Sequence, residues 1–109
     1  MRQRLLGAGL AAAIALPALA ADDAAQFALG RQLFTGGATP ACKVCHTLQD
    51  AGSDGQIGPV LDEIKPDADR VATTLRNGVK QMPSYRKILS EAQILALARY
   101  VSQASGGAR

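Results

Sequence analysis

The sequence has little of what usually builds the core or the active site of a small protein. It contains no tryptophan, two phenylalanines and two tyrosines, and its sulfur and imidazole metal ligands are two cysteines, one histidine and two methionines. A structural zinc site needs four ligands, which this chain does not offer together. The one possible disulfide would close a very short loop and stabilise the chain little. The core of so small a domain therefore needs another source of stability.

The first twenty residues have the pattern of a cleaved signal peptide. Arg2 and Arg4 precede an apolar run over residues 5–16, and Pro17 is followed by Ala-Leu-Ala at 18–20, a small-x-small cleavage site. The run is shorter than the ~20 apolar residues that span a membrane. The sequence predicts a signal peptide over residues 1–20, one domain over 21–109, periplasmic localisation and no stable membrane insertion after cleavage.

The charge of the chain excludes nucleic acid as a partner. The full sequence carries 12 Lys and Arg against 9 Asp and Glu, with a pI of about 9.2. Arg2 and Arg4 leave with the signal peptide, which brings the mature domain close to neutrality. No run of Lys and Arg remains to attract a phosphate backbone.

Helical patterns without β alternation predict an all-α domain with long loops. The first helix opens at Asp22–Asp23 and ends at Gly36–Gly37, and a second spans residues 67–77 before Gly78. Ser90, with Gln93 three positions on, begins the last helix with a capping box. Residues 42–47 form a short helical turn, and residues 35–41 and most of 49–65 are loops.

A glycine in the first helix predicts how the helices meet. Gly30 lies between Phe27 and Phe34 at helical spacing, which leaves a notch for a partner helix. Leu97 and Tyr100 of the last helix are the expected occupants.

The Cys-x-x-Cys-His motif at residues 42–46 concentrates the cysteine and histidine chemistry of the chain. A redox dithiol needs a βαβ setting, which is absent, and a small disulfide would leave His46 without a role. Covalent attachment of haem c uses every member of the motif: Cys42 and Cys45 form thioethers with the vinyl groups, and His46 becomes the proximal iron ligand. A large apolar macrocycle would also supply the missing core.

The second axial position has fewer candidates. Met82 is the only methionine that remains after signal cleavage, and it precedes Pro83 in a polar loop. Lys80 as the ligand, or an open position, is the alternative. A ligating histidine usually donates its other ring N–H to an oxygen atom, and Pro59 is a candidate for that carbonyl group.

These motifs resemble those of bacterial class I monohaem c-type cytochromes. The resemblance covers nearly the whole mature chain. It rests on C-x-x-C-H at 42–46, Ile-Gly-Pro at 57–59, Met-Pro at 82–83, and the flanking patterns Gly30-x-x-x-Phe34 and Leu97-x-x-Tyr100-Val101. It implies a cytochrome c-like fold of three main helices and long loops around one haem.

The same resemblance implies roles for single residues. His46 and Met82 would be the axial ligands, and Pro59 would accept the hydrogen bond from His46. Since tryptophan is missing, Arg76 or Asn77 would replace it beside a haem propionate. Residues 76–101 are also weakly similar to cytochrome partners or subunits of periplasmic sulfite dehydrogenases.

With both axial positions filled, the expected function is one-electron transfer and not enzymatic catalysis. The expected partners are redox proteins, namely a dehydrogenase as donor and an oxidase or reductase as acceptor. Lys43, Lys80, Arg86 and Lys87 flank the ligand segments and favour an acidic docking partner. The alternatives are a haem-based small-gas sensor or binder, and a cytochrome subunit of a larger periplasmic dehydrogenase.

Overall fold

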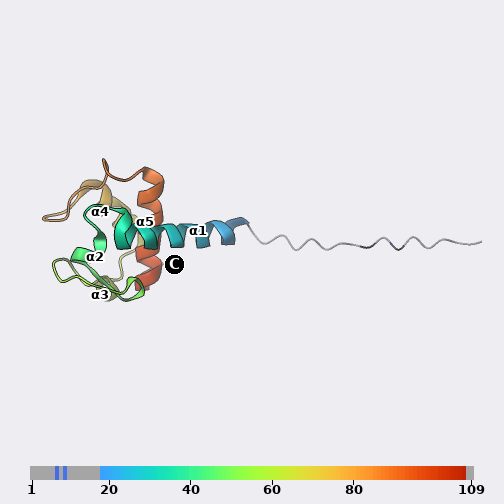
Figure 1. The fold of residues 1–109 in the computed structure, drawn as a ribbon, viewed down its shortest axis with the longest axis horizontal. Helices are drawn as coiled ribbons and strands as arrows, with labels where there is room; N and C mark the ends of the chain where they lie inside the picture. Colours follow the sequence, from blue (N-terminus) through green and yellow to red (C-terminus); the bar gives the residue numbers. More distant parts are fainter. Residues whose placement is uncertain (1–6, 8, 10–17, 108–109) are drawn as a thin grey trace, which may run out of the picture.

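The computed structural model describes residues 18–107, together with Gly7 and Gly9 (Figure 1). The signal peptide predicted over residues 1–20 lies, apart from its end, outside the described residues. Among the helices that are described, none is both long and apolar enough to cross a membrane.

The domain is helical, as predicted, with three main helices and short elements between them. The elements are α1 (Ala18–Gln32), the π-helical turn η1 (Leu33–Gly37), α2 (Cys42–Cys45), β1 (Thr47–Leu48), the 3₁₀ turn η2 (Gln49–Ala51), β2 (Ser53–Asp54), α3 (Leu61–Ile64), α4 (Ala68–Asn77) and α5 (Glu91–Ser105). Figure 1 shows α1 crossing α5, with α2, α3 and α4 on one side of this crossing.

The crossing of α1 and α5 is centred on Gly30. A Cβ atom at Gly30 would collide with the Cβ atom of Tyr100 and with the backbone carbonyl of Ala96, so only glycine allows the two helices to come this close. The Tyr100 ring packs edge-on against Phe27 and Phe34, with centroid distances of 4.9 and 5.9 Å. The prediction of Tyr100 as the occupant of this notch is confirmed, whereas Ala96 takes the place expected for Leu97.

Hydrogen bonds connect the crossing of α1 and α5 to Asp50 in η2. The Tyr100 hydroxyl donates to the Asp50 carboxylate (2.6 Å), and Arg31 of α1 donates to the Asp50 backbone carbonyl (3.0 Å). Burial of Tyr100, followed by its hydrogen bond to Asp50, raises the pKa of the phenol far above its ordinary value. The hydroxyl therefore stays a donor, and η2 is fixed to both helices.

Local capping chemistry sets the ends of α4 and α5 where the sequence predicts them. Asp67 accepts from the backbone N–H of Arg70 (2.8 Å), and Gly78 ends α4 with φ of 70°. Ser90 and Gln93 form the reciprocal capping box of α5, with bonds of 2.8 and 3.1 Å.

Two predictions need correction. Helix α1 begins at Ala18, four residues before Asp22, so the aspartates lie inside the helix and do not cap it. The alanine-rich stretch before Asp22 favours this extension. The predicted loop over 49–65 contains α3, and β2 pairs antiparallel with β1, Leu48 opposite Ser53. The Ser53 hydroxyl supports this pairing by donating to the His46 carbonyl (2.9 Å) and accepting from the Leu48 N–H (3.0 Å).

Substitution of Gly30 by alanine is expected to destabilise the protein. The added methyl group meets backbone and Cβ atoms that cannot rotate away, and overpacking of this kind costs about 1–3 kcal/mol. Denaturant unfolding would measure the loss. Gly36→Ala is the matched control, because a Cβ there meets nothing within 4 Å. Equal stability of the two variants would contradict the importance of this contact.

Candidate functional site

Helix α2 presents the three residues of the Cys-x-x-Cys-His motif on one short turn. The backbone N–H of His46 donates to the carbonyl of Cys42 (3.0 Å), which closes the turn and makes His46 its C-terminal cap. Cys42 is buried and Cys45 half-buried, and both are free thiols. Burial raises the pKa of Cys42 to about 11, so the enclosed thiol stays protonated at neutral pH.

The loop after the motif fixes the orientation of the His46 ring. His46 Nδ1 lies 2.7 Å from the carbonyl oxygen of Pro59. Since a carbonyl only accepts, Nδ1 carries the proton and Nε2 keeps its lone pair for a metal. The N–H of Gly58 donates to the Cys45 carbonyl (2.7 Å), and a Cβ at Gly58 would lie 2.5 Å from His46 Cε1. Glycine is thus needed where the loop passes the ring.

His46 faces an apolar crevice that also contains Cys42 and Met82. The crevice encloses about 680 Å³ of empty space, its open mouth included. It is lined by Phe34, Cys42, His46, Pro59, Leu61, Ile64, Pro66, Arg70, Val71, Thr74, Leu75, Val79, Met82, Leu97 and Val101. Most of these side chains are hydrocarbon, as expected of a site for a large apolar cofactor.

Met82 reaches the crevice from the loop between α4 and α5. Its backbone pairs with Val79 through two hydrogen bonds of 2.9 and 3.0 Å, and its half-buried side chain packs against the core. Lys80, the alternative ligand, is exposed and does not line the crevice. It has a left-handed backbone with φ of 51°, which forms part of the tight turn before Met82.

The charged residue at the crevice is Arg70, not Arg76. Arg76 forms an ion pair with Glu91, and Asn77 accepts a hydrogen bond from Arg86 (3.4 Å), so neither lines the crevice. Sequence reasoning missed Arg70, although its spacing from Thr74 places both on one face of α4.

The donor set and the walls of the crevice fit haem c. The imidazole Nε2 and the Met82 thioether are ligands that haem iron takes in cytochromes, and the two thiols suit covalent attachment. The apolar walls would bury the macrocycle between the main helices. Among the described residues, no cluster of three or more His, Cys, Asp or Glu side chains offers another metal site.

Helical architecture, motif and crevice define the class of protein as a c-type cytochrome, which carries haem c. A family model described as cytochrome c oxidase, cbb3-type, subunit III matches residues 25–101. The chain belongs to this family of cytochrome c domains.

A solved structure supports the same assignment. The c-type cytochrome SorU from Sinorhizobium meliloti is 46% identical in sequence and superposes with a TM-score of 0.73. The match covers 79% of this chain and 98% of SorU. No curated protein sequence shows a significant match. The predicted cytochrome c-like fold is thereby confirmed.

Loss of haem is expected to unfold the protein. The crevice walls Phe34, Leu97 and Val101 belong to the main core, and without haem they would face an open hydrated space. A Cys42→Ala/Cys45→Ala chain without haem should therefore show little helical circular dichroism and no cooperative melt, in contrast to the haem-loaded wild type. A cooperative thermal transition of the haem-free chain would contradict this prediction.

Proposed function

We propose that this cytochrome is a periplasmic one-electron carrier whose haem is attached through Cys42 and Cys45 and ligated by His46 and Met82. The observation that carries the proposal is that His46 and Met82, from segments on either side of α4, line the same apolar crevice. A covalent, six-coordinate site suits electron transfer, since the iron then has no exchangeable position for a substrate or gas.

The roles of the ligating residues follow from their surroundings. Haem c, when bound, would supply a reversible one-electron change at its iron. His46 donates from Nδ1 to Pro59, which fixes the ring and strengthens Nε2 as a donor. The Met82 thioether raises the reduction potential relative to two nitrogen ligands, and the apolar walls raise it further by excluding water.

Arg70 is our candidate partner for a haem propionate. It lines the crevice from the first turns of α4, while its aliphatic stem can cover the apolar wall and its guanidinium group can reach solvent. A guanidinium group binds a carboxylate through paired hydrogen bonds. This would fill the role that the missing tryptophan leaves open.

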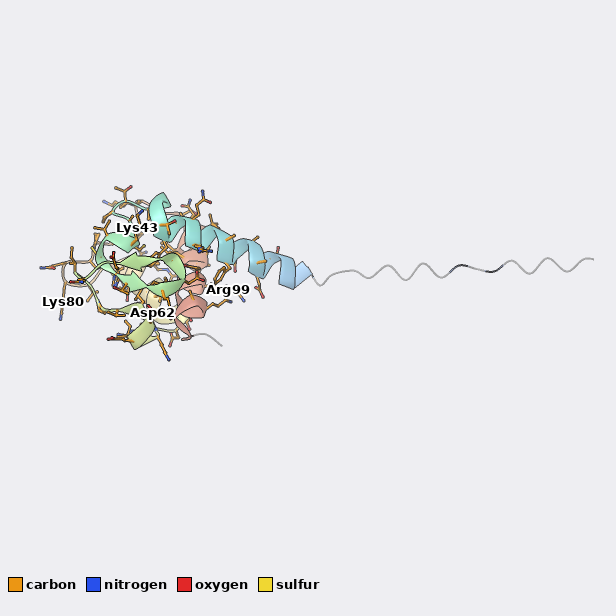
Figure 2. All side chains as sticks on the ribbon, turned by 60° about the horizontal axis from the view of Figure 1, so that its bottom comes forward. Lys43, Asp62, Lys80 and Arg99 are labelled. Carbon is orange, nitrogen blue, oxygen red and sulfur yellow. The ribbon has the colours of Figure 1, made fainter. Side chains whose placement is uncertain are left out.

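The surface around the ligand segments suits a transient redox partner. Val44, between the two cysteines, is 57% exposed, Ile57 is 67% exposed, and Val79 at the crevice is 53% exposed. Lys43 and Lys80 stand near these residues in the chain, and Figure 2 shows Lys80 at the end of the domain opposite the start of α1. Small apolar contacts with basic neighbours favour brief association with an acidic protein.

A periplasmic dehydrogenase is the proposed donor. The weak similarity of residues 76–101 to cytochromes that serve sulfite dehydrogenases makes such an enzyme the first to test. Size-exclusion chromatography of native extract would distinguish a free carrier from a permanent subunit of the dehydrogenase.

Substitution of Met82 by alanine tests the ligation. The oxidised wild type should show a low-spin spectrum with the weak far-red band of a methionine–iron bond, and its reduced form should not respond to carbon monoxide. Met82→Ala should lose the far-red band and bind carbon monoxide. Lys80→Ala is the control and should keep the wild-type spectrum.

Two outcomes would contradict the proposal. A high-spin wild type that binds carbon monoxide would favour the gas-sensor alternative. A wild-type spectrum retained in Met82→Ala would exclude Met82 as the ligand.

Electron transfer to an acidic redox protein is expected to slow as salt rises, because screening weakens long-range attraction. Removing two charges in Lys43→Gln/Lys80→Gln should lower the association rate several-fold at low salt and flatten its salt dependence. Stopped-flow measurements would test this. Arg99→Gln is the control. Arg99 of α5 pairs with Asp23 of α1, and it lies away from Lys80 (Figure 2). An equal effect of both variants would exclude a basic docking edge.

A further inference from the structure

The loop that carries Met82 has few anchors of its own. In the loop over residues 78–90, Tyr85 and Leu89 are the buried residues, with 3% and 5% of their surface exposed, and Met82 is half-buried. The residues around Met82 are exposed, and Lys80 projects away from the domain (Figure 2). Loops with so few buried contacts open at low free-energy cost. The Ser84 hydroxyl ties this loop to α4 by donating to the Arg76 carbonyl, and Tyr85 is the residue that ties it to the segment before Cys42.

Tyr85 connects this loop to two other segments. Its backbone N–H donates to the carbonyl of Leu75 in α4 (2.7 Å), which anchors the loop to the helix before it. Its hydroxyl donates to the carbonyl of Pro40 (2.6 Å), 45 residues earlier in the chain. Pro40 lies two residues before Cys42. One side chain thus joins the loop of the methionine to the segment that leads into the cysteine and histidine motif.

The hydroxyl of Tyr85 stays protonated, so this link persists over the ordinary pH range. Burial raises the pKa of Tyr85 to about 12. Among the described residues, Tyr100 is the other buried tyrosine; its hydroxyl donates to Asp50, on the central loop. The two phenols are similarly buried, but Tyr85 bonds to the segment before Cys42 and Tyr100 bonds to η2.

We propose that Tyr85 is the positioning residue for Met82. Its hydrogen bond to Pro40 clamps the two segments that border the crevice, and this clamp keeps the Met82 sulfur in place opposite His46. The role rests on the proposed His46/Met82 ligation. Tyr85 does not line the crevice, so it acts through the loop and not by contact with the cofactor.

Tyr85→Phe isolates the clamp, because it removes the hydroxyl and keeps the buried ring. Tyr100→Phe is the matched control, since it removes a buried phenol hydroxyl with a bond of the same length. Both variants should fold and bind haem. The readout is the rate at which imidazole, added in excess, replaces the sixth ligand of the oxidised holoprotein, followed by loss of the far-red band. Denaturant unfolding of both variants reports their general stability.

Tyr85→Phe is expected to bind imidazole about tenfold faster than the wild type, since loss of one hydrogen bond of ordinary strength changes the loop-opening equilibrium by about that factor. Tyr100→Phe should change this rate less than twofold, even where its stability falls as much. Equal rates in the two variants, or no acceleration in Tyr85→Phe, would overturn the role of Tyr85 and leave the ligation intact. A wild type without the far-red band would overturn the ligation itself, and with it this role.

Discussion

The contact between Gly30 and Tyr100 is the constraint on which the rest of the structure depends. It brings the first and last helices close enough for Phe34 on one side, and Leu97 and Val101 on the other, to form a continuous apolar wall. That wall is at once part of the core and part of the crevice. A domain with four aromatic side chains can therefore fold around a cofactor because the missing side chain at Gly30 lets the two helices approach closely.

The two sides of the crevice are built differently. On the His46 side, short-range bonds hold the ring: Gly58 to Cys45, Pro59 to His46, and Ser53 to the His46 carbonyl all lie within fifteen residues of one another. On the Met82 side, local bonds hold the loop to α4, and its link to the segment before Cys42 is a bond that spans 45 residues. The orientation of His46 is thus fixed by bonds between residues close in the sequence. The position of Met82 also depends on contacts between segments that are far apart in the sequence. This asymmetry suits the proposed ligation, in which His46 would be the stronger ligand and Met82 the weaker one.

Sequence reasoning succeeded where the controlling chemistry is local. The capping box at Ser90 and the glycine end of α4 depend on neighbouring residues, so their positions could be predicted. The hydrogen bond between His46 and Pro59 was also expected, because a ligating imidazole needs an acceptor at its other nitrogen.

The features that were missed depend on tertiary placement. Arg70 lies at the edge of the face that α4 turns toward the crevice, and its spacing from Thr74 does not show by itself what that face will border. The β1–β2 pair has two residues per strand, too few for alternation to be visible, and it is supported by the single hydroxyl of Ser53. The clamp between Tyr85 and Pro40 joins segments too far apart in the chain for spacing to connect them.

The burial of Cys42 has a consequence for biogenesis. The thiolate is the reactive form of cysteine, and enclosure in the crevice raises the pKa of this thiol to about 11, so the folded domain would offer a sluggish nucleophile. The walls contributed by Leu97 and Val101 come from α5, the last helix to be synthesised. If haem is attached at Cys42 as proposed, the thioether would form more readily in the open chain, before the domain folds around the thiol. On the proposed attachment, maturation would have a built-in order in which the bond forms first and folding then protects it.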